Sequence, residues 1–180
     1  MIFIKITIGI LFLIANLYSQ NIKYSCLIDN DIMLSILKTE SHKDKAIGYP
    51  YLISFNNVRD QKIIKKTSIK KYLLDNRTID CKNEDTCIKI TKTLLQVGIN
   101  NLDLGAFQIN YKFHKFKIKK YFNISESYYI ACNYIEDNVK KYGKNWYAVA
   151  GYHSFSLTHN LEYQKNLKRN YQKILAYKNN

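Results

Sequence analysis

Apolar residues along most of the chain recur at the spacing of a helix. In residues 26–39 they form one broad face, and the polar stretch 40–50 then breaks the pattern. Residues 84–97 show a helical pattern again, and Gly98 suits the left-handed position just past a helix end. The pattern therefore predicts helices over both stretches and places Glu40 at the end of the first.

The C-terminal part of the chain is also predicted to be helical. Ser125 is a suitable N-cap for a helix that ends near Gly143, and a shorter helix is expected over 145–152. A final helix is expected from about Asn160. Its apolar positions fall on one face and are Tyr163, Leu167, Tyr171, Ile174 and Leu175.

Only a few stretches predict anything other than helix. Residues 51–55, YLISF, are apolar and aromatic enough for a short strand, and the lysine-rich stretch 60–74 fits either a helix or a hairpin. The chain contains no repeat and no low-complexity linker, and Pro50 is its only proline. At 180 residues it is expected to form one compact domain, mainly α with a possible small strand pair.

The N-terminal residues have a different composition. Residues 1–19 carry Lys5 as their only charge, with an apolar run over 6–15 and a polar exit from Ser19. This pattern is typical of a secretory signal peptide. An uncleaved membrane anchor is the alternative, although the run is shorter than the roughly 20 residues that a spanning helix needs. We expect a signal peptide over 1–19, a domain over 20–180, and export.

Export would place the four cysteines in an oxidising compartment, where disulfides are the default. These residues are Cys26, Cys81, Cys87 and Cys132. Three pairings are possible, and we favour Cys81 with Cys87 and Cys26 with Cys132 because the first pair is close in sequence. A zinc site is the rival interpretation, but the spacings are irregular and no histidine pair falls at a ligand interval. We expect no metal.

The formal net charge of +14 predicts an anionic partner. Nucleic acid, acidic lipid and peptide-bearing cell-wall glycan all fit, and a merely solvated basic surface is the alternative. The chain also has 16 tyrosines, whose rings can stack on sugars as well as on bases. Because export argues against intracellular nucleic acid, we expect no nucleic-acid partner.

Three short pieces carry a family resemblance. They are Glu40-Ser41, the stretch GAFQIN at 105–110, and Tyr152-His153-Ser154. In this order, each at a helix junction, they resemble the lytic transglycosylases, and most closely the small IagB-type branch of peptidoglycan-cleaving enzymes associated with secretion machines and pili. The resemblance covers most of residues 26–175 and implies a lysozyme-like α+β fold with a glycan-binding groove.

The sequence also departs from that family. The turn has Ala106-Phe107 where the wider family prefers Leu-Met, and Gly151-Tyr152-His153 replaces the commoner Ala-Tyr-Asn, although the Tyr-His-Ser form is associated with the IagB-like branch. The interval from Glu40 to Gly105 is longer than in the soluble murein transglycosylases, so residues 56–83 have no firm counterpart. We expect this insertion to shape substrate choice or to bind a partner.

Glu40 is the predicted catalytic acid. Breaking a glycosidic bond needs a proton donor at the leaving oxygen, and apolar surroundings raise the pKa of a carboxyl until it holds a proton near neutral pH. The resemblance implies no second carboxylate, because the acetamido group of the sugar attacks its own anomeric carbon. Asp103 is the nearest candidate for one, yet its place before Leu104-Gly105 favours a turn or a helix cap.

The resemblance implies substrate-binding roles for seven further residues, namely Ser41, Gly105, Gln108, Asn110, Tyr152, His153 and Tyr171. Gly105 would let the backbone of the turn approach the sugar closely. The side-chain amides of Gln108 and Asn110 would contact the sugar, unless they only form hydrogen bonds with backbone groups of the loop. Ser41 would orient Glu40 or cap its helix. Tyr152 would stack on the sugar or hydrogen-bond it, and His153 would line the groove. The hydroxyl of Tyr171 would approach Glu40, although Tyr171 also fits core packing.

The resemblance thus implies a periplasmic peptidoglycan lytic transglycosylase. Such an enzyme cleaves the MurNAc-GlcNAc β-1,4 bond, leaves 1,6-anhydromuramic ends and opens the cell wall for a secretion or pilus apparatus. Its partners would be glycan strands and components of that apparatus, and we expect a monomer without a cofactor. Two alternatives stay open: a hydrolytic lysozyme-like muramidase, and a non-catalytic module that binds glycan or a partner protein.

Overall fold

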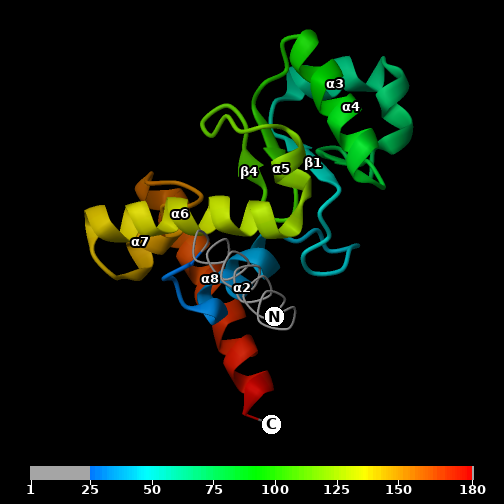
Figure 1. Ribbon diagram of the computed structural model, residues 1–180. Coiled ribbons are helices and arrows are strands. Elements are labelled where there is room, and N and C mark those ends of the chain that lie inside the picture. Colours follow the sequence, from blue (N-terminus) through cyan, green and yellow to red (C-terminus); the bar gives the residue numbers. More distant parts are fainter. Residues whose placement is uncertain (1–24, 180) are drawn as a thin grey trace, which may run out of the picture.

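The computed structural model describes residues 25–179, which fold into two parts that meet along α2 and the sheet (Figure 1). The helical part contains α2 (Asn30–Glu40), α6 (Ile124–Tyr142), α7 (Trp146–Ala150) and α8 (Leu157–Lys178). The sheet part contains four strands with α3 (Val58–Lys65), the 3-10 helix η2 (Ser68–Tyr72) and α4 (Glu84–Gln96). The short helix α5 (Lys119–Phe122) leads from the sheet part into α6.

The sheet is antiparallel with the strand order β2-β1-β3-β4. Its strands are β1 (Leu52–Phe55), β2 (Thr78–Asp80), β3 (Leu102–Leu104) and β4 (Ile109–Asn110). At its centre Ile53 lies opposite Ile79 on one side and Leu104 on the other. The strand predicted over 51–55 is confirmed. The sheet is larger than the predicted strand pair, because β2, β3 and β4 are too short to show an alternating pattern in the sequence.

The predicted helices are present, and the mainly α fold is confirmed. α2 ends at Glu40, and Gly98 adopts a φ of 81° just after α4. Three starting points differ from the prediction. α2 begins at Asn30, whereas the apolar pattern had suggested a helix over 26–39. Asn123, not Ser125, is the N-cap of α6, because its side chain accepts a hydrogen bond of 3.0 Å from the backbone N–H of Glu126. α8 begins at Leu157, earlier than expected, and most of the stretch 60–74 lies in α3 and η2.

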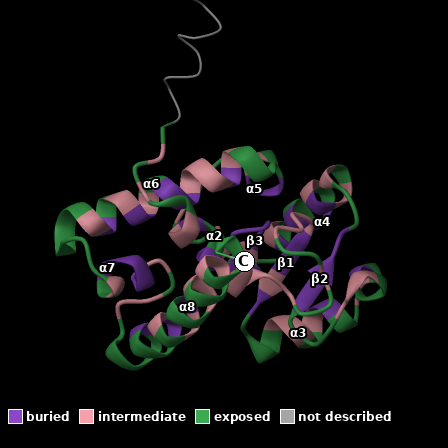
Figure 2. Ribbon diagram, turned by 90° about the horizontal axis from the view of Figure 1, so that it is seen from below, coloured by how far each residue is buried: buried purple, intermediate pink, exposed green. Residues whose placement is uncertain are grey.

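Buried positions occur in both parts, in purple in Figure 2, and most of them carry aromatic or aliphatic side chains. Phe55 of β1, Phe107 of the β3–β4 turn and Phe122 of α5 are at most 2 % exposed. Met33 and Ile36 of α2 are buried in the core, and α2 packs against α8. The position of its last residue, Glu40, is therefore fixed by packing.

Residues 56–83 add α3, η2 and β2 to the sheet part. Asp80 of β2 is only 2 % exposed and accepts hydrogen bonds from Lys45, Lys82 and Tyr49. Burial raises the pKa of this carboxyl, but the bonds from Lys45 and Lys82 outweigh it and lower the pKa to about 2. The loop that follows Glu40 is therefore tied to the sheet by an ionised buried aspartate.

Two disulfides brace the fold, and they are the favoured pairs. Cys26 is bonded to Cys132 of α6, and Cys81 is bonded to Cys87 of α4. Within the described residues no cysteine is free, which leaves no thiolate for the alternative zinc site. The first bridge spans 106 residues of sequence. Closing a loop of that size lowers the entropy of the unfolded chain and so stabilises the folded state by about 4 to 5 kcal/mol.

The predicted signal peptide, residues 1–19, lies outside the described residues. None of the helices between residues 25 and 179 has both the length and the apolar character that crossing a membrane requires.

Candidate active site

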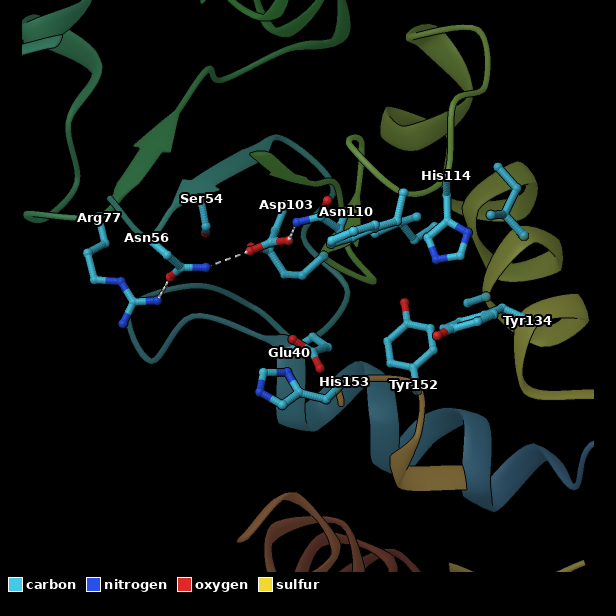
Figure 3. Close-up of a pocket in the computed structure, with 15 residues that line it drawn as sticks. Glu40, Ser54, Asn56, Arg77, Asp103, Asn110, His114, Tyr134, Tyr152 and His153 are labelled. Atoms are coloured by element: carbon cyan, nitrogen blue, oxygen red, sulfur yellow. Dashed lines mark hydrogen bonds between the residues drawn. The ribbon is translucent and has the colours of Figure 1, made fainter. Parts of the chain in front are cut away.

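A cavity of about 350 Å³ lies between the sheet and the helical part (Figure 3). That volume is in the range of small-molecule sites. Five predicted site residues line it: Glu40, Gln108, Asn110, Tyr152 and His153. The other lining residues are Ser54, Asn56, Arg77, Asp103, Ile109, Phe113, His114, Ile130, Ala131 and Tyr134.

Glu40 is the last residue of α2, and it is one of the residues that line the cavity (Figure 3). The hydroxyl of Tyr163 donates a hydrogen bond to its Oε1. Burial raises the pKa of Glu40 from 4.5 to about 7, the hydrogen bond from Tyr163 partly offsets this rise, and the negative charge of Asp103 adds to it. Near neutral pH a large fraction of Glu40 therefore holds a proton that it can donate.

The tyrosine that contacts Glu40 is Tyr163, and the prediction for Tyr171 is wrong. Tyr171 lies two turns further along α8, about 12 Å along the helix axis, and its ring packs against Trp146 at 5.4 Å. Tyr163 is 6 % exposed, and His153 stacks on its ring with the centroids 4.8 Å apart. The sequence pattern had marked Tyr163 only as a residue of the apolar helix face.

Ser41 acts as a cap in the structure. Its hydroxyl donates a hydrogen bond of 2.7 Å to the carbonyl of Leu37 and accepts one of 3.2 Å from the N–H of Gly48. The hydroxyl thus satisfies an open carbonyl at the end of α2 and fixes the next loop. Of the two roles considered for Ser41, these contacts match the cap.

Gly105 begins the turn between β3 and β4. Its φ is 76°, and a Cβ atom built at this position would lie 1.8 Å from the carbonyl oxygen of Tyr121. The turn is therefore pressed against α5 so closely that only glycine fits. Gly105 thus lies against the protein's own backbone at Tyr121, and this contact fixes the positions of the residues that follow it in the turn.

The two amides near this turn are engaged within the protein. The side chain of Gln108 donates a hydrogen bond of 2.6 Å to the carbonyl of Gly105. The side-chain nitrogen of Asn110 lies 2.9 Å from Oδ1 of Asn101 and 2.7 Å from Oδ1 of Asp103, and its oxygen accepts from Lys112 N–H at 3.0 Å. Gln108 thus holds the turn while it lines the cavity, and Asn110 holds Asp103.

Asp103 does not have the turn or cap role that the sequence favoured. It lies on β3 and faces the cavity, not in a turn or a helix cap. Burial raises its pKa, while hydrogen bonds from Asn110 and Asn56 act in the opposite direction. The structure thus brings a second carboxylate to the cavity that contains Glu40 (Figure 3).

Part of the additional segment 56–83 reaches the same cavity. The side-chain nitrogen of Asn56 donates to Asp103 at 3.3 Å, and the guanidinium of Arg77 donates to the oxygen of Asn56. Both side chains line the cavity beyond Asp103 (Figure 3). No motif marks these residues, because the contact depends on how β1 and β2 pair and not on local sequence.

Tyr152 and His153 form the helical wall with residues of α6. The hydroxyl of Tyr152 donates a 2.6 Å hydrogen bond to the carbonyl of Phe107, and its ring lies 5.8 Å from that of Tyr134. His114 packs against Tyr134 on the other side at 4.4 Å. Burial lowers the pKa of both His114 and His153, which favours the neutral imidazole at this wall.

Tyr163→Phe is expected to move the pH profile of the site. Removing the hydroxyl removes the hydrogen bond that stabilises the Glu40 carboxylate, so the pKa of Glu40 should rise above its value of about 7. An activity that requires protonated Glu40 should then persist to higher pH. The measurement is kcat/KM against pH for the two proteins, with Tyr171→Phe as the matched control. An unmoved alkaline limb would show that Tyr163 does not tune this carboxyl.

We compared the chain with family models, with curated proteins and with solved structures, and none of them matches it.

Proposed function

We propose that this protein cleaves the glycan strands of peptidoglycan with Glu40 as its acid and base. The observation that carries the proposal is a carboxyl with a pKa of about 7 at the end of α2, in the wall of a cavity of ligand size. A proton donor of this kind is what glycosidic bond cleavage requires. The cavity is also lined by three amide side chains and several aromatic rings, which suit a polyhydroxylated sugar.

The proposed reaction is that of a lytic transglycosylase and uses Glu40 twice. Glu40 first gives its proton to the glycosidic oxygen of the MurNAc-GlcNAc bond while the acetamido oxygen of the muramic sugar attacks the anomeric carbon. The resulting carboxylate then removes the proton of the 6-hydroxyl of that sugar, whose oxygen displaces the acetamido oxygen. A 1,6-anhydromuramic end forms without water, and Glu40 regains its proton. A pKa near neutral pH serves both steps.

The protein's location and partners belong to the same proposal. Its two disulfides are compatible with an oxidising compartment, and peptidoglycan would be met there in the periplasm. The net charge of +14 favours an anionic polymer as substrate. Local opening of the wall would make room for a secretion or pilus apparatus, whose components are the proposed protein partners.

Hydrolysis is the second candidate, and Asp103 favours it. Most glycosidases place two carboxylates at the scissile bond, one to donate a proton and one to activate water or to attack the sugar. Asp103 faces the same cavity as Glu40, so the site contains such a pair. A muramidase of this type would leave a reducing end.

Mass spectrometry of the products separates the candidates. The purified domain is incubated with peptidoglycan, and the soluble muropeptides are examined for the loss of one water that marks an anhydro end. We expect anhydromuropeptides, formed by Asp103→Asn as well as by the wild type. Reducing ends from the wild type, lost in Asp103→Asn, would establish hydrolysis instead. The absence of any product would favour the non-catalytic module.

A further inference from the structure

A lysine-rich loop borders the cavity between β4 and α5. Residues 111–120, YKFHKFKIKK, contain five lysines and no acidic residue. Phe113 and Phe116 alternate with the lysines and are 72 % and 44 % exposed. We call this segment the lysine-aromatic loop. Phe116 packs edge-on against Tyr121 and the Lys112 amine lies over the Phe113 ring, yet much of both phenyl rings stays open to solvent. Two exposed phenylalanines among like charges point to a ligand or partner.

The loop has a defined shape. The hydroxyl of the fully buried Tyr121 accepts a 2.9 Å hydrogen bond from the N–H of Phe116 and donates one to the carbonyl of His114. The N–H of His114 is held by the carbonyl of Asn110 at 3.0 Å, and its ring packs on Tyr134. The backbone is therefore fixed on both sides of Phe113, so the loop needs little rearrangement when a ligand arrives.

The loop lies directly beside the proposed catalytic cavity. Phe113 and His114 line that cavity, and Phe116 and Lys120 line a neighbouring hollow of about 180 Å³. Ile130 of α6 belongs to the walls of both. A ligand that occupies the cavity and carries side branches therefore lies close to the loop and to the second hollow.

The charge of the loop is not neutralised by the protein. Lys120 pairs with Glu126 at 3.4 Å, but no carboxylate of residues 25–179 lies within ion-pair distance of Lys112, Lys115 or Lys117. All three side chains are exposed. Uncompensated cations in a row attract anionic groups that are spaced along a chain.

We infer that the lysine-aromatic loop is a second binding site, which takes the carboxylates of the peptide stems on the glycan strand. This identification rests on the proposed function for the nature of the strand. Phe113 would pack on a sugar or peptide at the cavity edge, and Lys112, Lys115 and Lys117 would pair with carboxylates. The substrate class is then glycan that still bears its peptides, in preference to stripped strands.

An acidic membrane surface is the competing occupant, since phenylalanines and lysines also bind lipid interfaces. The position of Phe113 favours the glycan. Its side chain forms part of a concave wall shared with Asp103 and Tyr152, and a flat bilayer cannot follow the loop into that wall. A branched strand lying in the cavity can contact both.

Binding without cleavage tests the inference. The parent is the full domain with Glu40→Gln, and the test variant also carries Lys112→Gln, Lys115→Gln and Lys117→Gln. A control variant removes the same charge at and just beyond the C-terminal end of α6 through Lys140→Gln, Lys141→Gln and Lys144→Gln, exposed residues that line neither hollow. Each is sedimented with intact peptidoglycan and with strands whose peptides an amidase has removed, and its dissociation constant is measured.

We expect the loop variant to bind intact peptidoglycan about tenfold more weakly than the parent, with less than about twofold loss in the control. On amidase-treated strands the difference should shrink below about twofold. Equal binding of all three proteins to intact peptidoglycan would overturn the inference. So would a loop-specific loss on vesicles of acidic phospholipid without a loss on peptidoglycan. Because no turnover is measured, absence of cleavage by the wild type would contradict the proposed function and leave this binding result standing.

Discussion

Glu40→Gln is expected to reduce glycan cleavage by at least about 10³-fold while the domain stays folded and still binds glycan. The amide has nearly the shape of the carboxyl and can keep the contact with Tyr163, but it can neither donate a proton to the leaving oxygen nor remove one from the 6-hydroxyl. The loss should appear in kcat, because the affected steps are chemical ones. It is measured as the rate of release of soluble muropeptides at saturating peptidoglycan.

The same substitution should make the protein more stable at pH 7. In the folded protein Glu40 keeps its proton up to about pH 7, whereas in the unfolded chain it loses the proton near pH 4.5. Folding therefore takes up a proton between these values, and stability falls as the pH rises through this window. The glutamine side chain of the variant does not titrate, so the free energy of unfolding at pH 7 should rise by up to about 3 kcal/mol.

Urea unfolding at pH 4 and pH 7 measures this effect, with Glu84→Gln on α4 as the control that removes one carboxylate outside the cavity. The gain should be present at pH 7 and absent at pH 4. Wild-type activity in Glu40→Gln would exclude Glu40 as the acid. Loss of activity together with loss of stability would mean that the residue supports the fold instead of the reaction.

Gly105→Ala is expected to destabilise the domain by more than about 3 kcal/mol. The added methyl group meets the Tyr121 carbonyl at 1.8 Å, and the φ of 76° is unfavourable for alanine even without that contact. Relief requires the β3–β4 turn to move away from α5, which would displace Gln108 and Asp103 from the cavity wall. Chemical denaturation gives the loss of stability, and muropeptide release is expected to fall with it.

Gly98→Ala separates the two causes. Gly98 has a φ of 81°, nearly that of Gly105, but a Cβ atom there has no other atom within 4 Å. It should lose only about 1 kcal/mol from the backbone conformation. If both alanine variants lose the same amount, the close approach to Tyr121 is not what selects glycine at 105.

The helices were predictable because each buries one face, so its apolar residues recur at helical spacing along the sequence. α2 and α4 follow their patterns to within a few residues, and Glu40 ends α2 as expected. The sheet was largely missed, since a strand of two or three residues such as β4 or β2 has no period to detect. Such short strands form only because they pair with neighbouring strands, and this pairing is set by the tertiary structure.

The site was predictable only where a motif carried it. The motif residues Gln108, Asn110, Tyr152 and His153 do line one cavity with Glu40. Asp103 was misplaced because a residue before Leu-Gly suggests a turn, while strand pairing with Ser54 decides its direction. Tyr163 and Tyr171 occupy equivalent positions on one helix face, and only the packing of α8 against α2 selects the tyrosine that touches Glu40.

The contact between Glu40 and Tyr163 joins residues 123 positions apart. During synthesis the ribosome delivers Glu40 well before α8, so while the intervening residues are made the carboxyl lacks its Tyr163 partner and α2 lacks α8 to pack against. A nascent or prematurely terminated chain that ends before Tyr163 therefore carries the acid but not the environment that tunes it. The proposed activity would in this way become possible only once the helix that carries Tyr163 has been made.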